Sequence, residues 1–182
     1  MWNDIEIITE VKTISPFGWK SPLSWEELFV MAEAVGDVIS IHTDERWGGS
    51  FELLEKARRM TSKKILAKGI HENDDLIRRA ISSGADAVLI VGRIPKIYEA
   101  QCWIEPLTLK ELKTIPKEFK VVWNSRDLEI GSLKTETFEE ARKIRSGWLC
   151  QASNIKTVKD IKPGANAVLV GSHLHQFVDS LS

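Results

Sequence analysis

Lysine and glutamate side chains occur near the C-terminal ends of three expected β-strands. Glu10 and Lys12 end the first strand, Lys68 ends the third, and Glu105 lies in the fifth. A buried charge loses its hydration, which is costly unless an opposite charge lies nearby. Two lysines and two glutamates brought to one place offset each other's desolvation and shift each other's pKa values. Such a set suits general acid-base chemistry on a carbonyl substrate.

The alternative interpretation of each of these residues is a solvated side chain at a strand end. For a single residue this alternative is the more frequent outcome, but joint occurrence at corresponding ends of separate strands disfavours it. The sixth expected strand adds Asn124 and Arg126 at the same kind of position. We therefore treat the set as a candidate active site.

The last two expected strands end in residues that suit a phosphate site. Ser153 and Asn154 end the seventh strand, and Gly171 and Ser172 end the eighth, directly before a helix. Backbone N–H groups at a glycine turn and a helix N-terminus bind phosphate, and the loops after strands seven and eight are its usual place in an eight-stranded barrel. A Gly-Ser pair before a helix is also a common N-cap with no ligand, so both interpretations stay open.

The elements that must position these residues alternate between β-rich runs and amphipathic helical stretches. We expect strands at 5–12, 38–43, 64–70, 87–91, 102–107, 120–123, 148–151 and 167–171. We expect helices at 24–35, 50–60, 72–83, 109–115, 137–145, 157–161 and 173–181, with one helical turn within 95–101. Repeated β-α alternation predicts a parallel sheet covered by helices.

Eight strand-helix units predict one domain over 1–182, a minimal (β/α)8 TIM barrel. The chain of 182 residues is short for this fold, which typically takes about 250 residues. Very short loops and a nearly absent fourth helix are therefore expected. An open, flavodoxin-like sheet with fewer strands is the alternative, because periodicity alone does not exclude it.

Composition indicates an ordinary globular protein. Hydrophobic residues make up 43%, charged residues 28%, and the net charge is -1, which gives no electrostatic footprint for nucleic acid or an acidic membrane surface. No apolar run reaches the ~20 residues of a membrane span, and the N-terminus is unlike a signal peptide. Cys102 and Cys150 lack metal-ligand spacing, as do the four histidines, so we expect a cytoplasmic protein without a metal. Trp47 and Trp123 are interpreted as core residues, with stacking on an aromatic substrate as the alternative.

At these same residues the sequence resembles the indole-3-glycerol phosphate synthase family. The matching segments run in family order: 7–18, 39–54, 65–70, 84–91, 103–106, 123–130 and 164–174. The resemblance implies a phosphorylated substrate, 1-(o-carboxyphenylamino)-1-deoxyribulose 5-phosphate. Its ring closure, decarboxylation and dehydration yield indole-3-glycerol phosphate in tryptophan biosynthesis, so the enzyme is a carboxy-lyase that needs no metal or organic cofactor.

The resemblance also implies residue roles. Lys68 matches the general acid that activates the substrate carbonyl, and Glu105 matches a glutamate active in proton transfer during dehydration. Lys12 matches a lysine that meets the charged groups of the substrate, with Glu10 orienting it. The other matches are residues that position or bind the substrate: Asn124 and Arg126 at the anthranilate end, Ser15 beside that pocket, and Gly171 and Ser172 at the phosphate.

This sequence departs from the family pattern at strand seven. The family's Ala-Glu-Ser-Gly-Ile reads Gln151 to Ile155 here, so Ala152 replaces a glutamate and Asn154 replaces a phosphate-binding glycine. Gln151 compensates only if the strand slips by one residue, which turns it to the other face. Gly69 and Ile70 stand where Asp and Phe are common.

The helical extension that precedes the first strand in the family is also missing from the sequence. The alternatives to a synthase are therefore a related phosphate-binding barrel with a changed substrate, and a non-catalytic subunit. Such a subunit would bind other tryptophan-pathway proteins or copies of itself.

Overall fold

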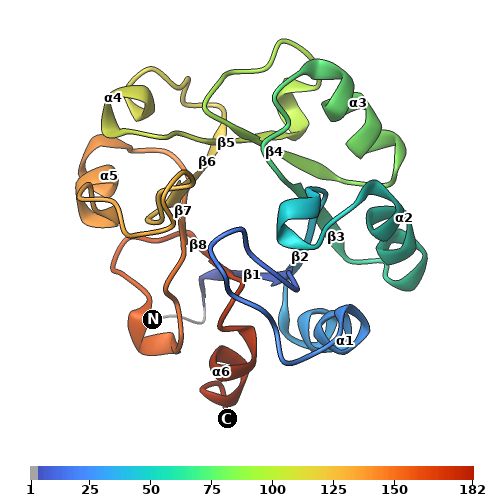
Figure 1. The fold of residues 1–182 in the computed structure, drawn as a ribbon. Coiled ribbons are helices and arrows are strands. Elements are labelled where there is room, and N and C mark those ends of the chain that lie inside the picture. The colour runs from blue at the N-terminus through green and yellow to red at the C-terminus, as the bar shows by residue number, and fades with distance from the viewer. Residues whose placement is uncertain (1–3) are drawn as a thin grey trace.

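The computed structural model describes residues 4–182 and contains a closed barrel of eight parallel strands (Figure 1). The strands are β1 Glu6–Val11, β2 Val38–His42, β3 Lys64–Lys68, β4 Ala87–Val91, β5 Cys102–Glu105, β6 Lys120–Asn124, β7 Leu149–Ala152 and β8 Ala167–Val170. Each strand pairs with the next along the chain, and β8 closes on β1 with Ile8 opposite Leu169. The (β/α)8 prediction is confirmed, and the open flavodoxin-like sheet is wrong.

Helices surround the ring of strands, as Figure 1 shows in a view along the barrel. The α-helices are α1 Trp25–Val35, α2 Phe51–Met60, α3 Asp74–Ser82, α4 Leu109–Leu112, α5 Phe138–Ile144 and α6 Leu174–Asp179. Three 3-10 turns lie wholly within the described residues: η2 Glu45–Trp47, η3 Glu99–Gln101 and η4 Val158–Asp160. Only a 3-10 turn follows β4 and β7, which explains how a barrel fits into so short a chain.

All eight predicted strands are present, but several predicted elements are too long, and the turn η2 was not predicted. β3 ends at Lys68, two residues before the predicted end, and β5 ends at Glu105 because Pro106 has no N–H to continue the ladder. Ser50 and Thr137 are N-caps with extended backbones, so their helices begin one residue later than expected. The helix expected at 157–161 is the 3-10 turn η4.

Side chains alternate between the two sides of the barrel wall, as strand geometry requires. Inward residues, among them Ile8, Leu66 and Leu89, fill the barrel, whereas outward residues pack beneath the helices. Trp123 is fully buried on the outer side, which confirms it as a core residue. Among the helices within residues 4–182, none combines the length and apolar character needed to cross a membrane.

Polar residues take over the inward positions at the C-terminal ends of the strands. His42 is the last residue of β2 and lies opposite Lys68 in the β2–β3 register. Glu10, Glu105 and Asn124 are buried at the ends of β1, β5 and β6. The apolar filling of the barrel therefore forms the floor of a polar mouth.

Candidate active site

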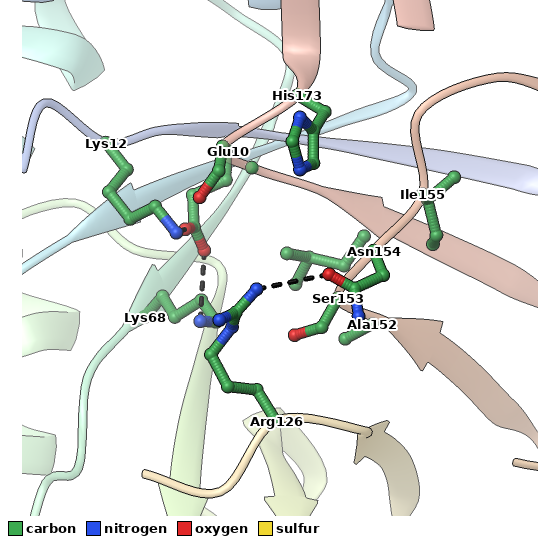
Figure 2. Close-up of a pocket in the computed structure, with 12 residues that line it drawn as sticks. Glu10, Lys12, Lys68, Arg126, Ala152, Ser153, Asn154, Ile155 and His173 are labelled. Carbon is green, nitrogen blue, oxygen red and sulfur yellow. Dashed lines mark hydrogen bonds and ion pairs between the residues drawn. The ribbon is translucent and has the colours of Figure 1, made fainter. Parts of the chain in front are cut away.

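Glu10 holds both lysines of the mouth. Its side chain is 1% exposed, with Oε2 3.1 Å from Lys68 Nζ and Oε1 3.6 Å from Lys12 Nζ (Figure 2). Burial by itself raises the pKa of Glu10, but Lys68 and then Lys12 outweigh it and lower this pKa to about 2. Glu10 is therefore ionised and anchors the two ammonium groups.

The two lysines differ in how firmly they keep their protons. Burial lowers the pKa of Lys68, but Glu10 and Glu105 outweigh this effect and the pKa is raised. For Lys12 burial prevails over the attraction of Glu10, and the pKa is lowered. Lys68 is thus the more strongly protonated of the two lysines, and Lys12 releases its proton more readily.

Glu105 has a very different environment from Glu10. It is 1% exposed, its Oε2 accepts a hydrogen bond from Asn124 Nδ2 at 3.3 Å, and its Oε1 is buried with no hydrogen-bond partner within the described residues. Burial raises the pKa of Glu105, and the opposing effects of Lys68 and Lys134 do not reverse it. A carboxyl group with a raised pKa can exchange protons with a substrate near neutral pH.

Asn124 is oriented by its neighbours. Its amide oxygen accepts hydrogen bonds from the backbone N–H of Arg126 at 3.0 Å and from Ser153 Oγ at 2.6 Å. Because two donors occupy the oxygen, the amide nitrogen must face Glu105. Asn124 therefore joins the ends of β5, β6 and β7 into one rigid polar wall.

Two adjoining cavities open above these residues. The first has a volume of about 410 Å³ and is mainly polar, and the second has a volume of about 450 Å³. Four residues line both of them: Lys12, Lys68, Arg126 and Ser153. Because Lys12 and Lys68 line both cavities, the ammonium groups lie where the two cavities adjoin.

The first cavity lies over the ends of β7 and β8. Its lining includes Asn154, Gly171, Ser172 and His173, and Figure 2 shows Arg126 reaching Asn154 across it. Arg126 Nη2 donates to Asn154 Oδ1 at 3.1 Å. A Cβ at Gly171 would lie 2.9 Å from Glu10 Oε1, so a larger residue here would require the Glu10 carboxylate to shift.

Ten of the eleven predicted site residues line the two cavities. Ser15 is the exception, because its Oγ accepts hydrogen bonds from the backbone N–H groups of Phe17 and Trp19 at 3.2 and 3.3 Å. The hydroxyl thus stabilises a turn in the first loop and does not face either cavity. Within residues 4–182, no group of three or more histidine, cysteine, aspartate and glutamate side chains is arranged to hold a metal ion.

Comparison with known proteins places the chain in a family. It is 31% identical over 193 residues to an indole-3-glycerol phosphate synthase of Sulfurisphaera tokodaii, covering 92% of this chain and 77% of the relative. The corresponding synthase of Pyrococcus furiosus is 28% identical, with 92% and 85% covered. The chain belongs to the indole-3-glycerol phosphate synthase family.

Two other comparisons complete the result. No family model matches the chain. Among solved structures, a mutant tryptophan synthase alpha-subunit from Pyrococcus furiosus superposes with a TM-score of 0.62 over 97% of both chains, at 16% sequence identity. This likeness shows the shared TIM-barrel fold alone.

Strand seven of this member of the indole-3-glycerol phosphate synthase family keeps a regular register. Ala152 is buried, faces the barrel interior and lines the first cavity. Gln151 lies opposite Trp123, and its side chain bonds the backbone of Asp160 at 2.9 Å and of Lys162 at 2.8 Å. No slip has occurred, so Gln151 does not replace the carboxylate that Ala152 lacks.

Among the residues of the second cavity that were not predicted as site residues, two aromatic rings stack on each other. The apolar wall of the cavity includes Trp47, and His42 lies beneath it, with ring centroids 5.0 Å apart and an angle of 10° between the planes. Trp47 is buried, as predicted for a core residue, but it also supplies the aromatic wall that Ile70 does not. His42 could have been predicted from the sequence, because it is a polar residue at the end of a strand, the same feature by which Lys68 was identified.

Proposed function

We propose that this protein is an indole-3-glycerol phosphate synthase, a carboxy-lyase of tryptophan biosynthesis that acts on 1-(o-carboxyphenylamino)-1-deoxyribulose 5-phosphate. The observation that carries the proposal is the convergence of Lys68, Lys12 and Glu105 on two adjoining cavities. Family membership supports the same activity.

The two cavities match the two ends of this substrate. The first cavity presents Arg126 and Lys12 together with Ser172, which suits a phosphate group. The resemblance places Arg126 at the anthranilate end, but we assign it to the phosphate end because its guanidinium bonds Asn154 in the first cavity. The second presents Trp47 and Leu128, which suit an aromatic ring. The ketone and the carboxylate of the substrate then lie between the cavities, beside the two ammonium groups.

The environments of the charged residues suggest the order of proton transfers. Lys68 protonates the carbonyl oxygen while the ring carbon that carries the carboxylate attacks the carbonyl carbon. Loss of carbon dioxide returns the bonding electrons of the carboxylate to the ring, and Lys12, which lines both cavities, would orient this carboxylate. Glu105, with its raised pKa, serves the proton transfers in which the new hydroxyl leaves as water.

A related barrel with a changed substrate is the second candidate. Ala152 and Asn154 favour it, because the first removes a carboxylate from the cavity wall and the second places an amide where the family pattern has glycine. Asn154 nevertheless keeps a left-handed backbone with φ 56°, which is the conformation glycine favours. The turn at Asn154 thus has a backbone conformation suited to glycine but presents an amide side chain.

An indole-fluorescence assay with the synthase substrate tests the proposal. We expect the wild-type protein to turn over and Lys68→Ala to lose about 10²- to 10⁴-fold in kcat, the usual contribution of a positioned acid. Lys64→Ala is the matched control, because Lys64 lies exposed at the opposite end of the same strand. Absence of turnover in the wild-type protein at high enzyme concentration would contradict the synthase assignment and favour the second candidate.

A further inference from the structure

His42 is a buried histidine to which the proposed function assigns no role. It is 3% exposed, ends β2 and lies opposite Lys68 in the parallel register, so that both side chains point into the barrel. His42 and Lys68 also line the second cavity together, with Glu105 in the same lining. A titratable side chain thus stands directly beside the proposed general acid.

The imidazole of His42 is neutral, and its proton lies on Nε2. The backbone N–H of Asp44 donates to His42 Nδ1 at 3.4 Å, so Nδ1 must accept. Burial first, then the positive charges of Lys68 and Lys12, lower the pKa of His42 to about 3, against the opposing effects of Glu10 and Asp44. The ring therefore remains an uncharged N–H donor across the physiological pH range.

The orientation of the ring is held by packing. Trp47 stacks on it, and the Arg46 guanidinium lies 5.1 Å from the centre of the Trp47 ring. Arg46 is itself held by Asp44, with Nη2 2.6 Å from Oδ2. Among residues 4–182, no hydrogen-bond partner is present for His42 Nε2, which leaves this donor available to a ligand in the cavity.

We propose that His42 donates a hydrogen bond from Nε2 to the same substrate carbonyl oxygen that Lys68 protonates. Two donors on neighbouring strands would then hold one oxygen, and they stabilise the negative charge that develops on it during carbon attack. His42 gives up no proton in this step, because the proton that forms the hydroxyl comes from Lys68. A neutral donor suits this place because a third cation would be repelled by Lys68 and Lys12.

This inference rests on the proposed function and deepens it, because it specifies which functional group of the substrate the site recognises. The pair of donors favours a phosphorylated ketone over the corresponding alcohol, since only the ketone oxygen gains negative charge when it is polarised. A fragment that contains the ketone but cannot react can therefore show whether His42 and Lys68 polarise it, without any turnover. Labelled 1-deoxyribulose 5-phosphate keeps the ketone and phosphate but lacks the arylamine, so it cannot close a ring.

The experiment measures the carbonyl stretching band of this fragment, carbon-13 labelled at the ketone, when it is bound to the wild-type protein and to three variants. We expect the band at lower frequency in the wild-type protein and in His42→Gln, which keeps an N–H donor, than in His42→Leu. The alcohol analogue should bind the wild-type and the leucine variant equally. His71→Gln is the control, because His71 is a buried histidine that lines neither cavity.

A parallel turnover assay separates this inference from the proposed function. We expect His42→Leu to lower kcat by about 10²- to 10³-fold with a smaller change in KM, as for the loss of one oxyanion donor, and His42→Gln to recover part of it. A band at one frequency in all variants overturns the role of His42, as does failure of the fragment to bind. A shifted band without wild-type turnover overturns the synthase assignment and leaves the donor pair standing.

Discussion

Glu10 and Glu105 show how one residue type acquires two opposite characters in the same mouth. Glu10 touches two ammonium groups, so its ionised form is stabilised and its pKa falls. Glu105 receives a single amide hydrogen bond, so burial dominates and its pKa rises. The first is therefore suited to hold cations and the second to move protons.

Replacement of these two glutamates is expected to change stability in opposite directions. Glu105 has a raised pKa, so in the wild-type protein it lowers the free energy of unfolding as the pH rises above 4.5, the ordinary value for this group. Glu105→Gln removes this penalty, so the variant gains stability relative to wild type between pH 4.5 and 7 while kcat falls about 10²-fold or more.

Glu10→Gln is the matched comparison. The stabilising contribution of Glu10 is fully present above pH 4.5 and is lost as the pH falls towards about 2. Its replacement should therefore destabilise the protein at pH 7 and have little effect near pH 2. Urea unfolding at a series of pH values measures both variants, and shifts of the same sign at pH 7 would contradict this account of the site.

Ala152 marks the place where a carboxylate of the family pattern is missing. Its side chain faces the first cavity, whose lining also includes Lys12 and Lys68. Ala152→Glu should raise kcat for the synthase substrate by about 10-fold or more, because a positioned proton-transfer group contributes at least that much. Ala152→Gln separates charge from size, and an equal effect of both substitutions would show that the carboxylate is not the cause.

At the level of elements, two loops meet above the barrel mouth. The loop after β1 contains an isolated bridge between Ile14 and Lys20, and the loop after β6 contains one between Arg126 and Leu133. Phe17 of the first loop packs so closely on Gly131 of the second that a Cβ there would lie 2.4 Å from the Phe17 ring. The contact couples β1 to β6 over the site.

Gly131→Ala is expected to weaken substrate binding. The residue has φ 76°, where alanine costs about 1 kcal/mol, and its added methyl group would displace Phe17. Arg126 Nη1 donates to the Gly131 carbonyl at 2.7 Å, so movement of the loop should disturb Arg126 and raise KM severalfold.

Gly18→Ala provides the control for this prediction. Gly18 has φ 93°, and within the described part of the chain no atom lies within 4 Å of the point that an added Cβ would occupy. Alanine at this position therefore adds backbone strain without a clash. Steady-state kinetics and thermal unfolding of the two variants isolate the Phe17 contact. Equal KM values for both would show that the meeting of the loops is irrelevant to binding.

At the scale of the whole molecule, the mouth gathers more positive than negative charge. Lys12, Lys68 and Arg126 line the cavities, while Glu10 is the carboxylate that is firmly ionised there. Cations held in a partly dehydrated mouth attract a phosphate dianion more strongly than they would in water. Binding of such an anion should therefore be measurable as a change in global stability.

Inorganic phosphate at 100 times its dissociation constant should raise the free energy of unfolding by about 2.7 kcal/mol. For a chain of this size that corresponds to an increase in Tm of roughly 5–10 °C. In Arg126→Ala, phosphate should raise Tm by less than in the wild-type protein, whatever the Tm of the variant without phosphate. Chloride at equal ionic strength should not produce the increase seen with phosphate. An equal response with and without Arg126 would place phosphate elsewhere.

Much of the barrel and of its mouth was predictable from the sequence, because the signals involved are local. Apolar, β-branched runs and cap residues such as Ser24 mark strands and helices without reference to the rest of the chain. Lys68 and Glu105 were identified because each polar residue interrupts an apolar run at a strand end. Element ends were less accurate, since Pro106 and the capping residues act over only one or two positions.

Tertiary structure alone decided which of these residues meet. Closure of β8 on β1 depends on the stagger of all eight strands, and this stagger brings Gly171 against Glu10. The same long-range register places His42 beside Lys68 and leaves Gln151 outside, whereas local turn hydrogen bonds withdraw Ser15. Sequence thus determined the elements through short-range preferences, and the pKa values and partners of the site arose only when distant strand ends were packed together.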